Sequence, residues 1–206
     1  TGGSPRVIFR EKAGSVQLVG VDDKEVFVSV NSNALAGDGG EGKLLAIRRG
    51  GGGSPRKVYE GPAILSWTLG QNAVFYCQVA VGYLPKKGVE SDGVILERGL
   101  GTRPEASTCL DAETDETTVY WHQSGTSGGI KARDFVKRDS PTRLLVSEAT
   151  DRLSVSGDHL YWSFAAKNEP ARIRRVKKDG TGAEEVAHGI GEITEFFVAF
   201  PYVYWT

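Results

Sequence analysis

Five short apolar runs along this chain share one pattern of large hydrophobic side chains. They lie at residues 26–30, 74–78, 119–123, 160–164 and 203–206. Aligned on their fourth positions, which are Ser29, Cys77, His122, Ser163 and Thr206, the runs follow one another in steps of 48, 45, 41 and 43 residues. The regular spacing predicts a repeat protein in which each run is an equivalent β-strand.

Each repeat unit divides into four strands, A to D, and the apolar run is strand B. In the fourth unit we expect strands at 152–156, 160–164, 172–177 and 184–187, separated by turns rich in Gly and Asp. Strand B is apolar on both faces, because Leu160 and Trp162 point one way and Tyr161 the other. A sheet that is apolar on both faces must be covered on both. The pattern therefore predicts an all-β fold, a β-propeller of four-stranded antiparallel blades.

We expect the chain to form a single propeller region of about 4.5 blades. The expected blades span about 15–60, 62–108, 109–148 and 150–188, with a half blade at 192–206. Residues 1–10 are expected to carry strand D of a preceding blade, at Pro5 to Arg10. We interpret both ends as cut from a parent ring of six or more blades.

Three of the strand B runs carry a Tyr-Trp pair, in Tyr120-Trp121-His122, Tyr161-Trp162-Ser163 and Tyr204-Trp205-Thr206. At these residues the chain resembles the YWTD-type and related six-bladed propeller families. The family's Asp position is occupied by Val30, Gln78, Gln123 and Phe164. The resemblance implies a propeller that recognises a protein or ligand without catalysis. We expect Trp121 and Trp162 to be buried between blades.

Composition gives little indication of the partner. The chain is 39% hydrophobic and 25% charged with a net charge of -1, so no bulk charge favours nucleic acid or an anionic membrane. No apolar run is long enough to span a bilayer. Cys77 and Cys109 fall at the same rim of neighbouring blades, where they could form a disulfide or remain two buried thiols. We expect an extracellular, cell-surface or periplasmic protein, with the cytoplasm as an open alternative.

The loops between strands B and C are the longest departures from the repeat, at 31–42 and 79–92. Binding residues often lie on long loops held by a rigid scaffold. We therefore expect a protein partner, or further blades of the same propeller, to meet this BC-loop face, and exposed blade edges could also associate. The candidate contact residues, on these loops or at the ends of strands B, are Asn31, Asn33, Gln78, Tyr83, His122 and Gln123.

No catalytic residues are predicted. The segment 37–43 has the spacing of a phosphate loop but is followed by Leu44, and the segment 125–129 has the spacing of a nucleophile elbow but is followed by a strand. No cofactor is expected, although Asp38 and Glu41 could hold calcium. The alternatives are a propeller hydrolase or sugar-dehydrogenase-type enzyme, or a carbohydrate-binding lectin.

Charged residues recur at the turns of one face. Basic residues follow strand C and acidic residues occupy the AB turns. We interpret them as a solvated rim of weak ion pairs, with a phosphate-binding collar as the alternative.

Overall fold

The computed structural model describes residues 7–11, 14–31, 40–64, 66–77, 80–87, 93–98, 109–124, 128–137, 139–148, 150–165 and 169–206. These residues form antiparallel strands joined by turns, and none of them lies in a helix long and apolar enough to cross a membrane. The strands belong to four four-stranded sheets and one two-stranded sheet, and within each sheet the strands pair in chain order.

Consecutive strands pair with one another in each sheet, and we number the five sheets as blades 1 to 5. Blade 1 contains β1 (Ser15–Val21), β2 (Glu25–Asn31), β3 (Glu41–Arg48) and β4 (Arg56–Pro62). Blade 2 contains β5 (Ser66–Leu69), β6 (Ala73–Cys77), β7 (Val81–Pro85) and β8 (Val94–Glu97). Blade 3 contains β9 (Cys109–Thr114), β10 (Thr118–Gln123), β11 (Gly129–Asp134) and β12 (Arg143–Val146). Blade 4 contains β13 (Arg152–Ser156), β14 (His159–Phe164), β15 (Ala171–Lys177) and β16 (Glu184–Ile190), and blade 5 contains β17 (Phe196–Ala199) and β18 (Tyr202–Trp205).

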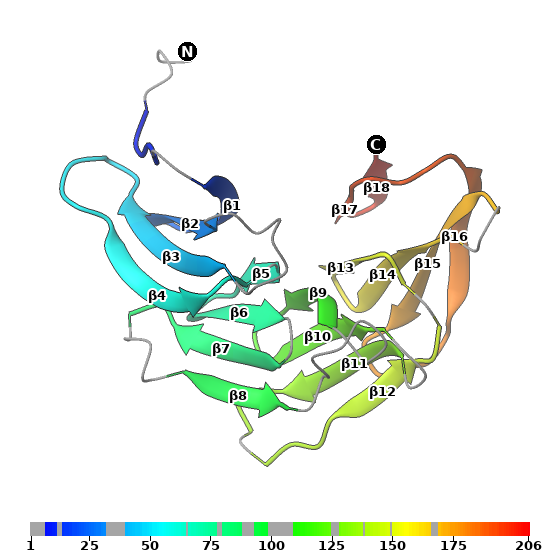
Figure 1. Ribbon diagram of the computed structural model, residues 1–206. Coiled ribbons are helices and arrows are strands. Elements are labelled where there is room, and N and C mark those ends of the chain that lie inside the picture. Colours follow the sequence, from blue (N-terminus) through cyan, green and yellow to red (C-terminus); the bar gives the residue numbers. More distant parts are fainter. Residues whose placement is uncertain are drawn as a thin grey trace.

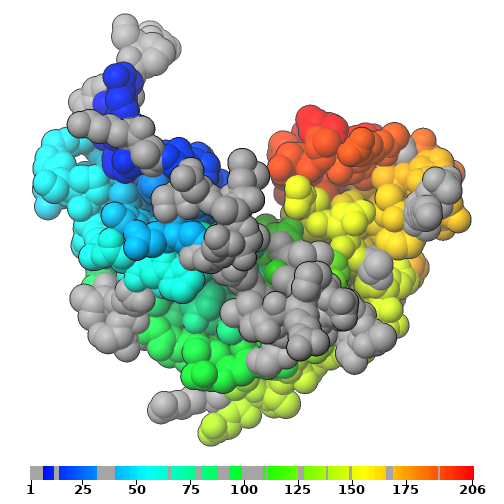
Figure 2. Space-filling view, in the orientation of Figure 1, coloured from blue at the N-terminus to red at the C-terminus, as the bar shows by residue number. Residues whose placement is uncertain are grey.

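The blades follow one another around an arc (Figure 1). The first strands of neighbouring blades, β1, β5, β9, β13 and β17, contact one another in sequence along the inner side of the arc. The arc is open between the first blade, blue to cyan, and the last, orange to red, and the space-filling view shows the same opening (Figure 2). This architecture is part of a β-propeller of four-stranded blades, as the repeat predicted, and the five apolar runs are its second strands.

The start of the chain differs from the expectation. Val7 to Arg10 were predicted to end a strand D, but none of these residues is in a strand. Residues 1–6 lie outside the described residues. A strand here would need a neighbouring strand C to pair with.

Apolar side chains fill the seams between blades. The third position of strand B faces the preceding blade, so Trp121 packs on Phe75 and Val81 of blade 2. Trp162 likewise packs on Tyr120 and Ile130 of blade 3. Both indole rings are fully buried, which confirms the expectation drawn from the repeat.

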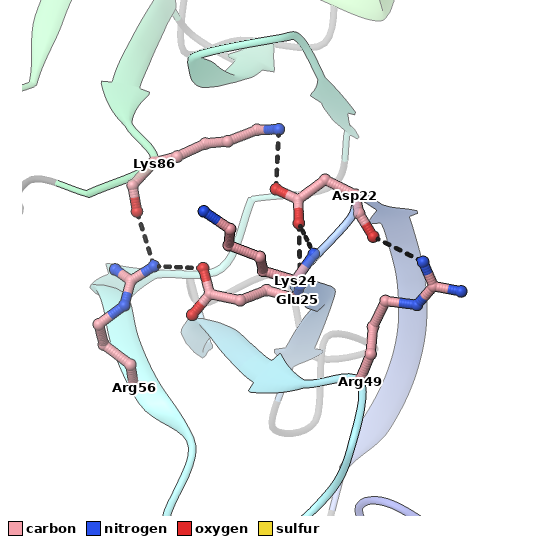
Figure 3. Close-up of polar contacts among 6 residues, drawn as sticks. All are labelled: Asp22, Lys24, Glu25, Arg49, Arg56 and Lys86. Carbon is pink, nitrogen blue, oxygen red and sulfur yellow. Dashed lines mark hydrogen bonds and ion pairs between the residues drawn. The ribbon is translucent and has the colours of Figure 1, made fainter.

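The rim that carries the AB and CD turns is more than a solvated edge. Lys86, the first residue after β7 in blade 2, donates from Nζ to Asp22 Oδ2 in the AB turn of blade 1 at 3.1 Å (Figure 3). Its ammonium also lies 5.5 Å from the centre of the Phe27 ring. Only 8% of Lys86 is exposed, so this pair is buried, unlike the weak, screened pairs expected at this rim, and Lys86 does not lie in an exposed BC loop as predicted.

Asp22 holds its own turn together as well as the seam. Its Oδ1 accepts hydrogen bonds from the backbone amides of Lys24 and Glu25 at 2.9 and 2.8 Å. Burial alone raises the pKa of Asp22, but those amides and the Lys86 ammonium together lower it to about 2. Asp22 is therefore ionised at any physiological pH.

The second of the two predicted long BC loops contains a strand. Residues 79–92 were expected to form a BC loop with Tyr83 near its tip, but Val81–Pro85 is β7 and pairs fully with β6. Position 82 accommodates only glycine, because a Cβ atom there would collide with the ring of Tyr76 on β6. The local Gly and Pro signals favoured a turn, and pairing with the apolar β6 outweighs them.

Candidate functional site

The inner strands of all five blades enclose one polar pocket. Its volume is about 250 Å³. The lining residues come from β1, β5, β9, β13 and the start of β17, and are Gln17, Ser66, Trp67, Asp111, Glu113, Arg152, Leu153, Glu195 and Phe196. We call this the axial pocket.

One position of the repeat lines the axial pocket five times. Gln17 pairs with Ser29, Ser66 with Cys77, Asp111 with His122 and Arg152 with Ser163, which are the fourth positions of successive strands B. In blade 5 the carbonyl of Glu195 accepts the Thr206 amide, at the same level. The polar ring therefore lies toward the ends of strands B, where the BC loops begin. Its side chains differ from blade to blade, so it is a composite site and not five copies of one site.

A β-bulge in β9 directs two carboxyl groups of blade 3 into the axial pocket. The register between β9 and β10 shifts between His122 and Gln123, so Asp111 pairs with His122 while Cys109 pairs with Gln123. Such a bulge changes the face to which the following residues point. Asp111 and Glu113 thus line the pocket, whereas Cys109 joins Ala112 in the core shared with blade 2.

Asp111 ties blade 3 to blade 4 at the pocket wall. Its Oδ2 accepts a hydrogen bond from the Leu153 amide of β13 at 3.0 Å, and its Oδ1 accepts one from the Ala112 amide at 3.0 Å. Burial raises the pKa of Asp111 to about 6, although these amides and the charge of Arg152 act in the opposite direction. The carboxyl group is therefore mainly ionised near neutral pH.

Glu113 lies two residues along the same strand and has a different charge state. Burial, reinforced by the charge of Asp111, raises the pKa of Glu113 to about 8. At neutral pH this side chain is mostly protonated and can donate a hydrogen bond as well as accept one. The pocket thus presents an acceptor, a donor and the guanidinium of Arg152 within one small volume.

A disulfide fixes the neighbouring seam. Cys77, the last residue of β6, is bonded to Cys109, the first residue of β9, and their Cα atoms are 5.4 Å apart. The sequence left a disulfide and two free thiols open, and the structure has the disulfide. It joins blades 2 and 3 beside the polar ring, because Ser66 of the ring pairs with Cys77.

The residues proposed from the sequence are dispersed. Asn31, His122 and Gln123 are buried at strand ends and not exposed on a loop. Asn31 donates from Nδ2 to the Ile64 carbonyl at 3.4 Å, and burial lowers the pKa of His122 against the opposing charge of Asp151. These three side chains are thus buried in the structure, and their contact with a partner stays a prediction. Asn33, Gln78 and Asp38 lie outside the described residues.

Two further candidates do not line the axial pocket. Tyr83 is half-buried on β7, where its ring packs 5.6 Å from that of Phe75 and 5.9 Å from that of Phe135. Glu41 is the exposed first residue of β3. The part of the chain that the structure describes contains no group of three or more His, Cys, Asp or Glu side chains able to hold a metal ion. Calcium at Asp38 and Glu41 stays a prediction.

Sequence reasoning missed the pocket residues. These residues differ in type from one strand A to the next and form no repeated pattern, and it is their common position that matters. The signal was the alternation Asp111-Ala112-Glu113, which places two carboxyl groups on one face of an inner strand.

Known structures share the fold of this chain. A chain in the crystal structure of a nidogen/laminin complex is 16% identical with a TM-score of 0.59, over 80% of this chain and 66% of that one. A chain from a study of two prolyl endopeptidases is 14% identical with a TM-score of 0.59, over 97% of this chain and 32% of that one. A puromycin-hydrolysing peptidase of Mycobacterium tuberculosis is 14% identical with a TM-score of 0.52, over 84% of this chain and 28% of that one.

At these identities the likeness establishes the propeller fold alone. This chain spans about two thirds of the matched chain in the nidogen/laminin complex and about a third or less of the two peptidases. No protein family profile matches the sequence, and no curated protein matches it.

Proposed function

We propose that this chain is a non-catalytic binding module that recognises a protein through the BC-loop face. The observation that carries the proposal is the polar ring, in which one repeat position supplies Gln17, Ser66, Asp111, Arg152 and Glu195 to a single pocket. A position that serves only the fold can carry the same residue in every blade. A recognition site needs different polar groups on its different sides. The nidogen/laminin complex, a complex of two proteins, supports a protein as the partner.

The pocket suits a single side chain. Its volume of about 250 Å³ is below the range of most small-molecule pockets. Three carboxyl groups, those of Asp111, Glu113 and Glu195, face one guanidinium, that of Arg152. A lysine or arginine side chain of the partner therefore fits the pocket best, with Asp111 as its counter-ion.

A photocrosslinking experiment tests this function. Gln17 is replaced by benzoylphenylalanine in the full chain, the protein is irradiated with extracts of its native source, and the captured peptide is identified by mass spectrometry. We expect a peptide from one protein, with Lys or Arg beside the crosslink, and loss of capture on Asp111→Lys. The matched control carries the crosslinker at Leu144, which is exposed on the outer strand β12. Equal capture from both positions would refute the proposal.

One observation favours an enzyme as a second candidate. Asp111 and Glu113 are adjacent carboxyl groups whose pKa values are about 6 and about 8. Such a separation is typical of an acid and base pair, as in a propeller hydrolase. Turnover of aryl glycosides or aryl esters that is lost in both Asp111→Asn and Glu113→Gln would support this candidate over the first.

The YWTD-type family and an extracellular or periplasmic location remain part of the proposal. Buried Trp121 and Trp162 in equivalent strands support the family. The Cys77–Cys109 disulfide supports an oxidising compartment, because disulfides persist there and are rare in the cytosol. Thiol trapping in intact cells of the native source would show both cysteines unreactive if the location is right.

A further inference from the structure

One side chain at a repeated position connects each of blades 2, 3 and 4 to the blade before it. The first residue after strand C is Arg49, Lys86, Phe135 or Lys178 in blades 1 to 4, and each donates its backbone amide to the AB turn of its own blade. In blades 2 to 4 the side chain then crosses to the preceding blade. Because the backbone position is fixed, the chemistry of this side chain and of the group that it meets defines the contact between the two blades.

In the seams between blades 1 and 2, 2 and 3, and 3 and 4, this side chain meets a group of matched chemistry. Lys86 meets Asp22 at 3.1 Å, and Lys178 Nζ meets Asp115 Oδ2 at 2.8 Å. Asp115 also accepts the Thr117 and Thr118 amides, as Asp22 does in its own turn. Between these two ionic seams, Phe135 packs on Phe75 with ring centres 4.7 Å apart. A base therefore meets a carboxylate, and an aromatic ring meets an aromatic ring.

Arg49 occupies the same position in blade 1, where none of the residues that the structure describes forms a preceding blade. Its side chain is exposed and donates to the Asp22 carbonyl of its own turn at 3.3 Å. The apolar part of this face is also uncovered. Leu18 is 63% exposed, whereas Ala112 and Leu153, its equivalents beside Trp121 and Trp162, are 2% and 4% exposed.

We infer that this face of blade 1, built from Leu18, Val16 and Arg49, is the docking surface for one further four-stranded blade of the ring, whose AB turn presents a carboxylate to Arg49. The buried equivalents in blades 3 and 4 show what covers this position, and the base-to-carboxylate rule specifies the charge of the turn. The inference concerns a different surface from the axial pocket and does not depend on the proposed function.

A second copy of this chain fits the surface less well. In a head-to-tail contact Arg49 would meet the AB turn of blade 5, which is Phe200-Pro201 and holds no carboxylate. Arg49 would lose its water without gaining a counter-ion. The docking blade therefore resembles blade 3, whose Asp115 and Tyr120 cover Lys178 and Leu153 of blade 4.

The test supplies such a blade to the full chain. A second copy of residues 109–148, with its cysteine replaced by serine, is joined ahead of Thr1. We expect hydrogen exchange of the β1 amides to slow by about tenfold or more and binding of an apolar dye to fall. Arg49→Glu should abolish both changes in the fused protein, and Asp115→Lys in the added copy should restore them. Arg48→Glu is the matched control, because Arg48 is exposed one residue earlier.

Three outcomes overturn the inference. The first is an added blade that leaves β1 exchange and dye binding unchanged. The second is a fused protein in which Arg49→Glu has no more effect than Arg48→Glu. The third is a dimer of the unfused chain in sedimentation experiments that Leu18→Asp dissociates, since that would assign the surface to a second copy.

Discussion

Strands β14 and β18 carry the same Tyr-Trp pair at the same positions of the repeat, yet they lie in very different surroundings. Trp162 and Tyr161 of β14 are 0% and 3% exposed, whereas Trp205 and Tyr204 of β18 are 45% and 46% exposed. The β14 sheet has four strands and a blade on each side, and the β18 sheet has two strands and one neighbour. Burial of the motif therefore depends on the strands that surround it, in its own blade as well as in the neighbouring ones, and not on the motif itself.

The largest expected effect is on these two tryptophans. Trp162→Ala should lower the free energy of unfolding by about 3 to 5 kcal/mol, because it leaves a cavity in the seam between blades 3 and 4. Trp205→Ala should cost about 1 kcal/mol or less, because much of that ring is already in water. Urea unfolding of both variants measures the difference. Equal losses would mean that the two strands have the same surroundings in solution.

The disulfide between blades 2 and 3 should contribute almost as much to the free energy of unfolding as Trp162 does. It joins residues 32 apart in sequence, so the Cys77→Ser/Cys109→Ser variant should lose about 3 to 4 kcal/mol, chiefly through the greater entropy of its unfolded chain. Thermal unfolding with and without a reductant measures this. The reductant should lower the melting temperature of the parent protein and leave the double variant unchanged. A parent protein insensitive to a reductant that is shown to cleave the bond would contradict this expectation.

The ionic seams offer a smaller contrast of the same kind. Asp22→Asn should cost about 1 to 3 kcal/mol, because it leaves the buried Lys86 ammonium without its partner. Asp158→Asn, in the exposed AB turn of blade 4 next to the half blade, should stay within about 0.5 kcal/mol.

The pH dependence gives the ionic seam a second readout. The pKa of Asp22 is lowered from 3.8 to about 2, so its contribution to stability is present above pH 3.8 and is lost as the pH falls toward 2. Acid unfolding curves of the two variants should therefore differ only for Asp22→Asn relative to the parent protein. Parallel curves for all three proteins would mean that Lys86 does not hold Asp22 in solution.

The last contrast concerns Glu113 in the axial pocket. Its pKa is raised from 4.5 to about 8, so the stability that it contributes is present below pH 4.5 and declines as the pH rises to about 8. Glu113→Gln should flatten the dependence of the melting temperature on pH between 4.5 and 8. Glu195→Gln, exposed at the open end of the same pocket, is the control. If the melting temperature of Glu113→Gln depends on pH as that of the parent protein does, a group other than Glu113 causes the dependence.

The repeat made most of the fold predictable. Five equivalent strands and the burial of Trp121 and Trp162 follow from the spacing, because a strand that is apolar on both faces has to lie between two others. The strand Val81–Pro85 was missed because Gly82 and Pro85 indicate a turn locally, and only pairing with β6 makes them part of a strand.

The site was harder to predict than the fold. The residues of the polar ring share a position but not a chemical type, so no repeated motif marks them, and only the convergence of the inner strands brings them together. The burial of Lys86 was not predicted either, because this residue was expected in the BC loop 79–92. A basic residue after a strand is usually solvated, and its burial depends on the AB turn of a different blade.

The bond between Cys77 and Cys109 has a consequence for how the chain responds to proteolysis. Lys87 is exposed and lies between the two cysteines in sequence. A trypsin cut after Lys87 would produce the pieces 1–87 and 88–206, which remain one covalent molecule through the disulfide and one folded body through the packing of Trp121 against blade 2. The nicked protein should migrate as a single band without reductant and as two bands with it, so its integrity on a gel would report the redox state and not the continuity of the backbone.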